Sequence, residues 1–413
     1  MIMNMKSLLV CAVVSVLQTG RAEWIPLVGD GIADDTAAIQ QRLDAGSSCV
    51  YLPPPAKAYL VSRTLRIPSN CELRLDRWTP VRLADGANVP LLANANPKAG
   101  NRRVAVTGGV WDFNNAGQLP NPDAWMRLRR EGKLAEGVSD PVWPTGPTNH
   151  YSLSHGMTFY NVRELEIRNV TLRNPVTYAL RLGGVTDFTI DTVAFDFTRA
   201  NPVKANMDGV HLDGGCRYGR ISNLRGTCYD DLLALNADDG DQNEFSHEGP
   251  ISDIDVDGIY AEYCHSAVRL LSTGMPLEGI SIRNVHGNFY RYAIGLTHFF
   301  ADRPTRGRMS DITIADCHVG KALQPADLQW KLAPYPLVYV DRRLDIDSLT
   351  VRSFLRDERT DASVPTIRIA EGCCIDRLVL RDCGQVNRRD GSFPFLENGG
   401  TVRKLVEENT LCK

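Results

Sequence analysis

The sequence predicts an all-β fold, a right-handed parallel β-helix, because one phrase of alternating apolar and polar residues recurs along most of the chain. The phrase occurs at residues 165–170 (LEIRNV), 280–285 (ISIRNV) and 378–383 (LVLRDC). A second short apolar run lies between successive phrases, for example at residues 232–235 (LLAL) and 267–270 (AVRL). Strand-and-turn repeats of roughly 20 to 40 residues indicate a solenoid. A β-sandwich also has many short strands, but it does not repeat one two-strand phrase in the same order.

Residues 1–22 have the pattern of a secretory signal peptide. Lys6 precedes an apolar stretch at residues 8–17, and the small residues Gly20 and Ala22 suit a cleavage site after Ala22. The apolar stretch is shorter than the roughly 20 residues that a membrane-spanning helix needs. We therefore expect a secreted or periplasmic protein without a membrane span, whose residues 23–413 form a single β-helix domain.

An N-terminal cap is expected at about residues 23–75, because the end of a solenoid exposes an open strand edge that must be covered. Residues 29–40 (GDGIADDTAAIQ) supply a turn and then a helix start at Asp34 or Asp35. Ile39 and Leu43 are spaced i,i+4, as on the buried face of a capping helix. This opening also resembles the one shared by pectate-lyase-like β-helix proteins.

The repeat is interrupted by a long insertion at about residues 116–154. Its aromatic and basic residues are Trp125, Arg127, Arg129, Arg130 and Trp143. Aromatic content argues against disorder, so the insertion is expected to form one wall of a cleft or to cover an apolar side of the solenoid. The segments at residues 298–308 and around Trp330 are candidates for other walls.

Composition excludes some partners and leaves others open. The net charge is −3 and the basic residues are dispersed, so nucleic acid is not an expected partner. Ten cysteines remain after Cys11 leaves with the signal peptide, and Cys216 with Cys228 or Cys49 with Cys71 are conceivable disulfides. Free thiols buried in the core are the alternative. No spacing of His and Cys indicates zinc, and no cofactor is expected.

Polar residues crowd three rungs, where a rung is one turn of the solenoid. The three segments are residues 206–213 (NMDGVHLD), 229–231 (YDD) and 265–269 (HSAVR). Their central apolar residues are Val210, Leu233 and Val268. Aligned on these, Asp208 and Asp231 occupy one column, with rungs about 4.8 Å apart. Asp230 and Asp231 can both face solvent only if the strand begins there with a bend.

Three carboxylates brought together in this way have a chemical consequence. Mutual repulsion should raise the pKa of one of them. A protonated acid beside ionised partners is what cleavage of a glycosidic bond requires. A solvated ladder of aspartates, or a Ca²⁺ site made of oxygen ligands, is the alternative interpretation.

Four short motifs resemble those of glycoside hydrolase family 28, the polygalacturonases and their relatives. Residues 206–211 (NMDGVH) resemble that family's NTDGIH, and residues 229–231 (YDD) resemble its GDD with Tyr229 in place of Gly. Residues 269–271 (RLL) resemble its RIK, and residues 108–114 (GGVWDFN) its GGxIDGxG. The order and spacing of the motifs together carry the resemblance.

The resemblance implies a role for each matching residue. Asp230 would be the general acid that protonates the leaving oxygen, while Asp208 and Asp231 would hold and deprotonate the attacking water in an inverting mechanism. Asn206 would orient these carboxylates or the water. Arg269 would bind an oxygen or a carboxylate of the substrate.

The chain also departs from the family pattern. No GHG motif is present: His247 lacks the flanking glycines, and His265 lies nearer Arg269, so both are candidate substrate-binding residues. His211 is a third candidate, either as a partner in the site or as a turn residue. Leu271 replaces the lysine of RIK, which weakens the case for homogalacturonan and leaves another acidic or a neutral glycan open.

Several further polar residues near the motifs are expected to form turns. These are Asp213, Asn236, Asp238, Asp239 and Asp241. For the later four, Ca²⁺ binding is the minority interpretation.

The sequence therefore predicts an exported glycoside hydrolase that acts on a pectin-like or other acidic polysaccharide or oligosaccharide. One alternative is a β-helix polysaccharide lyase or epimerase, which would use Arg269 and a metal such as Ca²⁺ bound by the aspartates. The other is a solenoid that binds glycans without catalysis. The oligomeric state is not predicted.

Overall fold

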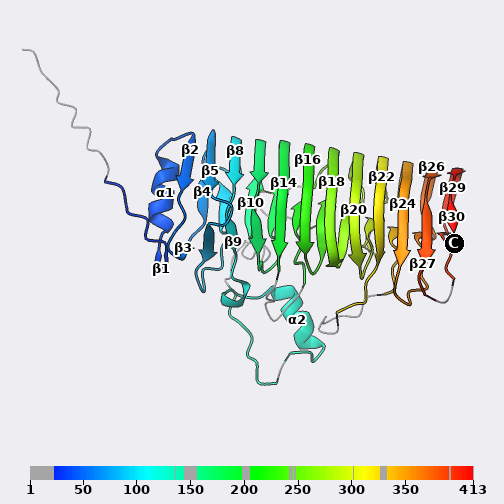
Figure 1. Cartoon of the computed structure of the whole chain (residues 1–413), viewed down its shortest axis with the longest axis horizontal. Coiled ribbons are helices and arrows are strands. Elements are labelled where there is room, and N and C mark those ends of the chain that lie inside the picture. The colour runs from blue at the N-terminus through cyan, green and yellow to red at the C-terminus, as the bar shows by residue number, and fades with distance from the viewer. Residues whose placement is uncertain are drawn as a thin grey trace, which may run out of the picture.

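The protein is a right-handed parallel β-helix in the computed structural model, which describes residues 23–134, 136–143, 156–197, 205–240, 245, 248–300, 302–325, 333–389 and 392–412. Every strand pairing in this part of the chain is parallel, and the rungs stack along the long axis of the molecule (Figure 1). Two sheets of 19 and 11 strands, here called sheet A and sheet B, form the walls.

Sheet A contains the longer strands of each rung. They are β1 (Asp30–Asp34), β2 (Cys49–Leu52), β3 (Ala58–Val61), β5 (Cys71–Leu75), β6 (Pro80–Leu83), β8 (Asn101–Thr107), β9 (Val110–Asp112), β11 (Val162–Arg168), β12 (Thr171–Arg173), β14 (Thr186–Asp196), β16 (Arg217–Thr227), β18 (Ile251–Cys264), β20 (Pro276–Phe289), β22 (Gly307–Lys321), β24 (Leu344–Glu358), β26 (Cys374–Arg381), β27 (Gly384–Asn387), β29 (Thr401–Glu408) and β30 (Leu411–Cys412).

Sheet B contains the short strands of the rungs, and the second apolar run of the repeats predicted the seven of them that lie between residues 180 and 369. The strands of sheet B are β4 (Leu65–Ile67), β7 (Leu92–Asn94), β10 (Met157–Tyr160), β13 (Leu180–Gly183), β15 (Val210–Leu212), β17 (Asp231–Asn236), β19 (Ser266–Leu271), β21 (Ile294–Thr297), β23 (Val338–Val340), β25 (Ile367–Ile369) and β28 (Leu396–Asn398).

The core consists of columns of aliphatic side chains that stack from rung to rung. One column in sheet A is formed by Ile167, Ile190, Ile221, Val256, Ile282, Ile314, Val351 and Leu380. All eight side chains are fully buried. Burying each one stabilises the fold by about 1.5–3 kcal/mol relative to exposure, which explains why the period-two pattern fixes the register.

Each repeated phrase contains a left-handed backbone residue just before its last apolar position. Its fifth position has a positive φ at Asn169, Thr192, Gly258, Asn284, Asp316, Ser353 and Asp382. Asn, Asp and Gly reach this conformation at the lowest cost, and it turns the strand at the same place in every rung. The polar residue that recurs in the sequence phrase is therefore a bend in the wall of the solenoid.

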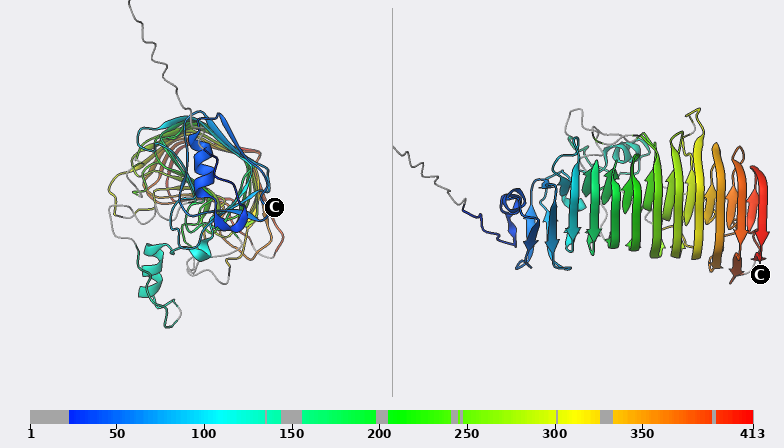
Figure 2. Two further views of the ribbon diagram at one scale, coloured as in Figure 1. Left: turned by 90° about the vertical axis from the view of Figure 1, so that its left-hand side faces the viewer. Right: turned by 90° about the horizontal axis from the view of Figure 1, so that it is seen from above.

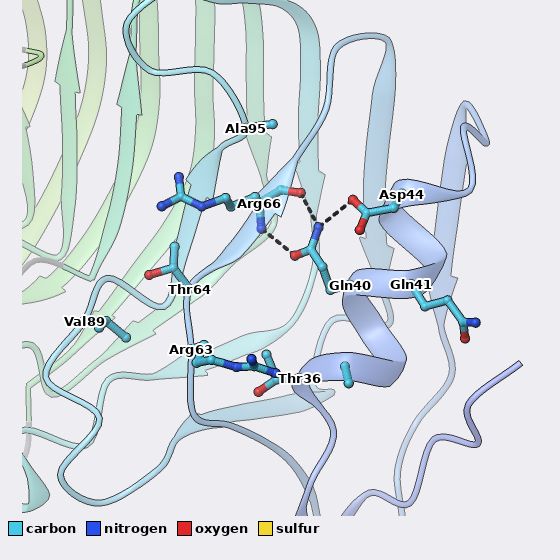
Figure 3. A pocket seen from close by; sticks show the side chains of 10 residues that line it. Thr36, Gln40, Gln41, Asp44, Arg63, Thr64, Arg66, Val89 and Ala95 are labelled. Atoms are coloured by element: carbon cyan, nitrogen blue, oxygen red, sulfur yellow. Dashed lines mark hydrogen bonds between the residues drawn. The ribbon is translucent and has the colours of Figure 1, made fainter.

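The predicted cap is present as α1 (Thr36–Asp44), which has Asp35 at its N-cap and buries Ile39 and Leu43. Gln40 connects it to the first strand of sheet B: its side-chain oxygen accepts from the Arg66 N–H at 2.9 Å, and its amide nitrogen donates to the Arg66 carbonyl at 3.1 Å (Figure 3). The side chain thus takes the place of a neighbouring strand and satisfies an edge that would otherwise be open.

The insertion contains a 3₁₀ turn, η1 (Asn115–Gly117), and a helix, α2 (Pro122–Arg130), which stands off the solenoid (Figures 1 and 2). Asn121 caps α2 by accepting from two backbone N–H groups. Trp125 packs edge-on against Trp143 with ring centroids 6.4 Å apart, in a small apolar cluster that also contacts Ala205. The insertion therefore packs onto the segment that leads into Asp208.

Other predictions have separate outcomes. The signal-peptide prediction falls on residues outside the described part of the chain. Among the described residues, no helix is long and apolar enough to cross a membrane.

The nine described cysteines outside β30 are all free, so the conceivable disulfides Cys216–Cys228 and Cys49–Cys71 are absent. Cys228 instead lies beside Cys264, with the two sulfur atoms 3.2 Å apart.

Candidate active site

The three polar segments lie on consecutive rungs of sheet B, in the register that the sequence predicted. Val210 pairs with Leu233, and Leu233 pairs with Val268. Counting back two positions places Asp208 beside Asp231, and the Gly209 N–H donates to the Asp231 carbonyl at 3.1 Å. Two carboxylates of adjacent rungs therefore occupy one column, about one inter-strand spacing apart.

The consecutive residues Asp230 and Asp231 lie where the chain bends into β17. The strand begins at Asp231, and Asp230 lies in the bend before it. The side chain of Asp231 is fully buried, whereas that of Asp230 is 21% exposed. Oδ1 of Asp230 has no hydrogen-bond partner, although His265 Nδ1 is 3.6 Å away. Asp230 is therefore the carboxylate of this pair that solvent reaches.

Asp231 is held by an arginine from the next rung. Nε of Arg269 lies 3.0 Å from Oδ2 of Asp231, as an ion pair whose N–H bond is not directed at the oxygen. The Tyr292 hydroxyl donates to Oδ1 of Asp231 at 3.5 Å. Burial opposes the charge of Arg269, but the Asp231 carboxylate more than compensates and holds the arginine pKa above its usual value. Arg269 therefore neutralises Asp231 inside the wall.

Asp208 is buried beneath these residues. Burial, together with the charges of Asp230 and Asp231, raises the pKa of Asp208 to about 7, while its hydrogen bond to His211 opposes the rise. The repulsion that the sequence predicted is therefore present, but it acts on Asp208. This agrees with the physical rule that a carboxyl taken out of water beside like charges retains its proton.

His211 is completely buried, so it does not reach substrate directly, and of the two roles left open by the sequence its contacts fit that of a partner in the site. Its Nδ1 lies 2.9 Å from Oδ2 of Asp208, and its Nε2 lies 3.4 Å from Oδ1 of Asp213. Its ring stacks on Tyr178 with centroids 3.9 Å apart. Asp213, expected to be a turn residue, is instead buried and forms a two-point ion pair with Arg181 at 2.8 and 3.0 Å.

His265 lies beside Asp230 in the third rung. Burial, and secondarily the charge of Arg291, lowers the pKa of His265 to about 3, so the imidazole is neutral at physiological pH. Its Nδ1 is hydrogen-bonded to the Ser266 hydroxyl at 2.9 Å. His247, the other candidate, lies outside the described residues.

Asn206 lies at the edge of the cluster, in a left-handed conformation. Its side-chain oxygen accepts from the amide of Asn121, the N-cap of α2. Among the described residues, no hydrogen bond joins Asn206 to the carboxylates. The insertion therefore fixes the side chain of Asn206 from outside the solenoid.

One combination of these side chains could hold a cation. Asp230, Asp231 and His265 offer ligand atoms that lie within 4.8 Å of one another. Two carboxylates and an imidazole suit a transition metal better than Ca²⁺, which prefers oxygen ligands. The guanidinium of Arg269, 3.0 Å from Oδ2 of Asp231, competes with a cation for this carboxylate.

Sequence reasoning missed Arg291, which extends the site by one rung. Asp230, His265 and Arg291 each precede the central apolar residue of their rung by three positions, and the Arg291 N–H donates to the His265 carbonyl at 3.0 Å. The register could therefore have revealed it. Its guanidinium lies over the rings of Tyr292 and Tyr335, 4.9 and 5.3 Å from their centroids.

A cavity of about 520 Å³ adjoins the cluster on its C-terminal side. The residues that line it with Arg291 include Tyr292, Phe299, Tyr335, Tyr339, Asp341 and Arg342. The carboxylate of Asp341 is already hydrogen-bonded, since it accepts from the backbone N–H groups of His298, Phe299 and Arg342. The cavity therefore combines aromatic ring faces with two arginines and, at its edge, the exposed carboxylate of Glu371. Ring faces and guanidinium groups are suited to a sugar that carries an anionic group.

Comparison with known proteins places the fold. No family model matches the chain, and no curated protein matches its sequence. An endo-xylogalacturonan hydrolase from Aspergillus tubingensis is similar in structure, with 13% identity, a TM-score of 0.57 and coverage of 90% of this chain and 98% of that one. A family 28 exopolygalacturonase from Yersinia enterocolitica has 13% identity and a TM-score of 0.55, over 92% and 76% of the two chains.

A surface adhesin of Streptococcus pneumoniae shares the architecture as well. It has 14% identity and a TM-score of 0.50, over 94% of this chain and 91% of the adhesin. At these identities the likeness shows the parallel β-helix fold, which supports both enzymes and an adhesin. Function must therefore be argued from the side chains of the site.

Proposed function

We propose that the protein is a glycoside hydrolase that cleaves an acidic polysaccharide or oligosaccharide with inversion. The observation that carries the proposal is the convergence of three carboxylates from two adjacent rungs, of which Asp230 reaches solvent while Asp208 and Asp231 are held from behind. Two of the structural neighbours are named as an exopolygalacturonase and an endo-xylogalacturonan hydrolase, which supports the same choice.

In the proposed mechanism each side chain has a distinct task. Asp230 donates a proton to the leaving glycosidic oxygen, and the neutral imidazole of His265 lies beside it, with Nδ1 3.6 Å from Oδ1 of Asp230. Asp208 and Asp231 hold the water that attacks from the opposite face and take up its proton. Arg269 supplies the positive charge next to Asp231.

The substrate class follows from the adjoining cavity. Arg291 and Arg342 provide positive charge, and Tyr335 and Tyr339 provide ring faces, so we propose that an acidic sugar unit binds there. In this proposal the two arginines bind the acidic group of the sugar, in place of the lysine that Leu271 replaces. Export to the periplasm or the exterior, where such polysaccharides occur, is part of the same proposal.

A metal-dependent lyase or epimerase is the second candidate, because Asp230, Asp231 and His265 bring three possible ligand atoms within 4.8 Å. A lyase leaves an unsaturated sugar that absorbs ultraviolet light, and a chelator would abolish its activity. A hydrolase releases saturated products that do not absorb in this way, and a chelator would leave its activity unchanged.

The test is to incubate the wild type and Asp230→Asn with a panel of acidic and neutral polysaccharides. We expect saturated products from the wild type, released with inverted anomeric configuration by NMR, and a rate at least about 100-fold lower in the variant. Asp255→Asn, which alters a partly exposed ion pair with Arg283 on sheet A, is the matched control and should retain full activity. Unsaturated products, or an active Asp230→Asn, would overturn the assignment.

A further inference from the structure

A chain of charged side chains runs behind the candidate active site, from Arg181 to Asp208. Arg181 donates to both oxygens of Asp213, at 2.8 and 3.0 Å. Nε2 of His211 lies 3.4 Å from Asp213, and its Nδ1 lies 2.9 Å from Asp208. None of these four side chains is more than 6% exposed, so solvent does not screen the interactions between their charges.

The fold positions these residues through the register of sheet B. Arg181 of β13 and His211 of β15 are partners in adjacent rungs. Asp208 precedes β15 and Asp213 follows it, so a strand of three residues presents a carboxylate at each end of the imidazole. The stack on Tyr178, with an interplanar angle of 16°, fixes the plane of the ring. Both ring nitrogens therefore face carboxylate oxygens, and Nε2 also lies 3.3 Å from the side-chain nitrogen of Asn236.

Neighbouring elements add further charged and polar groups. Those that face His211 or Asp208 are Tyr178 and Arg181 on the β13 rung, Cys228, Asp230, Asp231, Asn236 and Asp239 on the β17 rung, and Arg269 on the β19 rung. Among them, Oδ2 of Asp239 lies 3.6 Å from Nε2 of His211. The surroundings of His211 are therefore rich in carboxylates, which favour its charged form.

We propose that His211, held as an imidazolium between two carboxylates, is a positioning residue that fixes Asp208 and keeps it able to ionise when it takes a proton from the attacking water. Arg181 neutralises Asp213, so the positive charge of His211 remains available to Asp208. The inference rests on the proposed function and adds Arg181, His211 and Asp213 to it.

The electrostatics of the pair agree with this geometry. Burial opposes the charged form of His211, but the hydrogen bonds to Asp208 and Asp213 raise its pKa to about 9. The same charge restrains the pKa of Asp208, which burial and its carboxylate neighbours raise. Removing the positive charge would raise the pKa of Asp208 further, so the carboxylate form would be reached only at higher pH.

The test compares His211→Gln and Asp213→Asn with the wild type on the polysaccharide that the wild type cleaves. The acidic limb of kcat/KM against pH reports the ionisation of the base in the free enzyme. We expect it to move upward by at least about one pH unit in His211→Gln, and less in Asp213→Asn, where the imidazole remains. His318→Gln, on an exposed position of sheet A, is the matched control and should leave the limb in place.

A second measurement does not depend on activity. In protein with ¹⁵N-labelled histidine, NMR should show His211 still protonated at pH 8 in the wild type and titrating at lower pH in Asp213→Asn. A wild type that cleaves but whose acidic limb stays fixed in His211→Gln, or a His211 that titrates below pH 7, would overturn the inference and leave the proposed function standing. Absence of cleavage by the wild type across the panel would overturn the proposed function instead.

Discussion

At the scale of single residues, the three aspartates of the site differ in what surrounds them. Arg269 neutralises Asp231, and His211 binds one oxygen of Asp208. Asp230 retains an oxygen without a hydrogen-bond partner and a partly exposed side chain. The carboxylates can lie close together because each of the two buried ones has its own cationic partner, Arg269 for Asp231 and His211 for Asp208.

Removal of Arg269 should show how much this support contributes. Arg269→Met leaves the fully buried Asp231 without its counter-charge, so we expect unfolding in urea to show a loss of about 3–5 kcal/mol. Arg283→Met, which breaks a partly exposed ion pair with Asp255 on sheet A, should change stability by no more than about 1 kcal/mol. Equal losses in the two variants would show that Arg269 does not stabilise a buried charge.

At the scale of elements, the rungs could be predicted from sequence because their signal is local. The period-two pattern placed β15, β17 and β19 in the correct register, and with them the column of Asp208 and Asp231. The helix α1 followed from its cap and its i,i+4 spacing.

The rest of the site depends on contacts that a single rung does not encode. Asp239 returns to His211 only because the chain after β17 folds back, with its Oδ2 accepting from Asn236 at 2.8 Å. Asp213 was expected in a turn because it follows a strand. Its ion pair with Arg181 was not foreseen, because Arg181 is 32 residues earlier in the chain. Sequence patterns report which way a strand faces, but loop lengths and paths decide which side chains meet.

The left-handed bend near the end of each repeated phrase offers a prediction at this scale. Thr192 adopts φ +56° there, a conformation that is costly for a β-branched residue. Thr192→Asn introduces the residue that Asn169, Asn223 and Asn284 supply at this position in other rungs, so we expect thermal or urea unfolding to show a gain of up to about 1 kcal/mol. Thr189→Asn, in the interior of β14, should instead lower stability. A destabilised Thr192→Asn would contradict this account of the bend.

At the scale of the whole molecule, a solenoid must protect both ends of its stack. The N-terminal end is covered by α1, with Gln40 satisfying the backbone of β4. At the other end, no described strand pairs with the outer edge of β29. There the aliphatic column of sheet A continues from Leu380 to Glu407, so a charged residue occupies a position that is apolar in the eight rungs before it.

We expect this inward-facing charge to prevent end-to-end association of β-helices, since burial of Glu407 against another molecule would cost the solvation of its carboxylate. Leu405 in the same strand is already 43% exposed, so Glu407→Leu would create an apolar strand edge. Size-exclusion chromatography with light scattering should then show larger species than the wild type at the same concentration. Glu407→Gln, which remains polar at the same position, should behave as the wild type. If Glu407→Leu also matches the wild type, the edge must be protected by something other than the charge, such as the twist of the last rung.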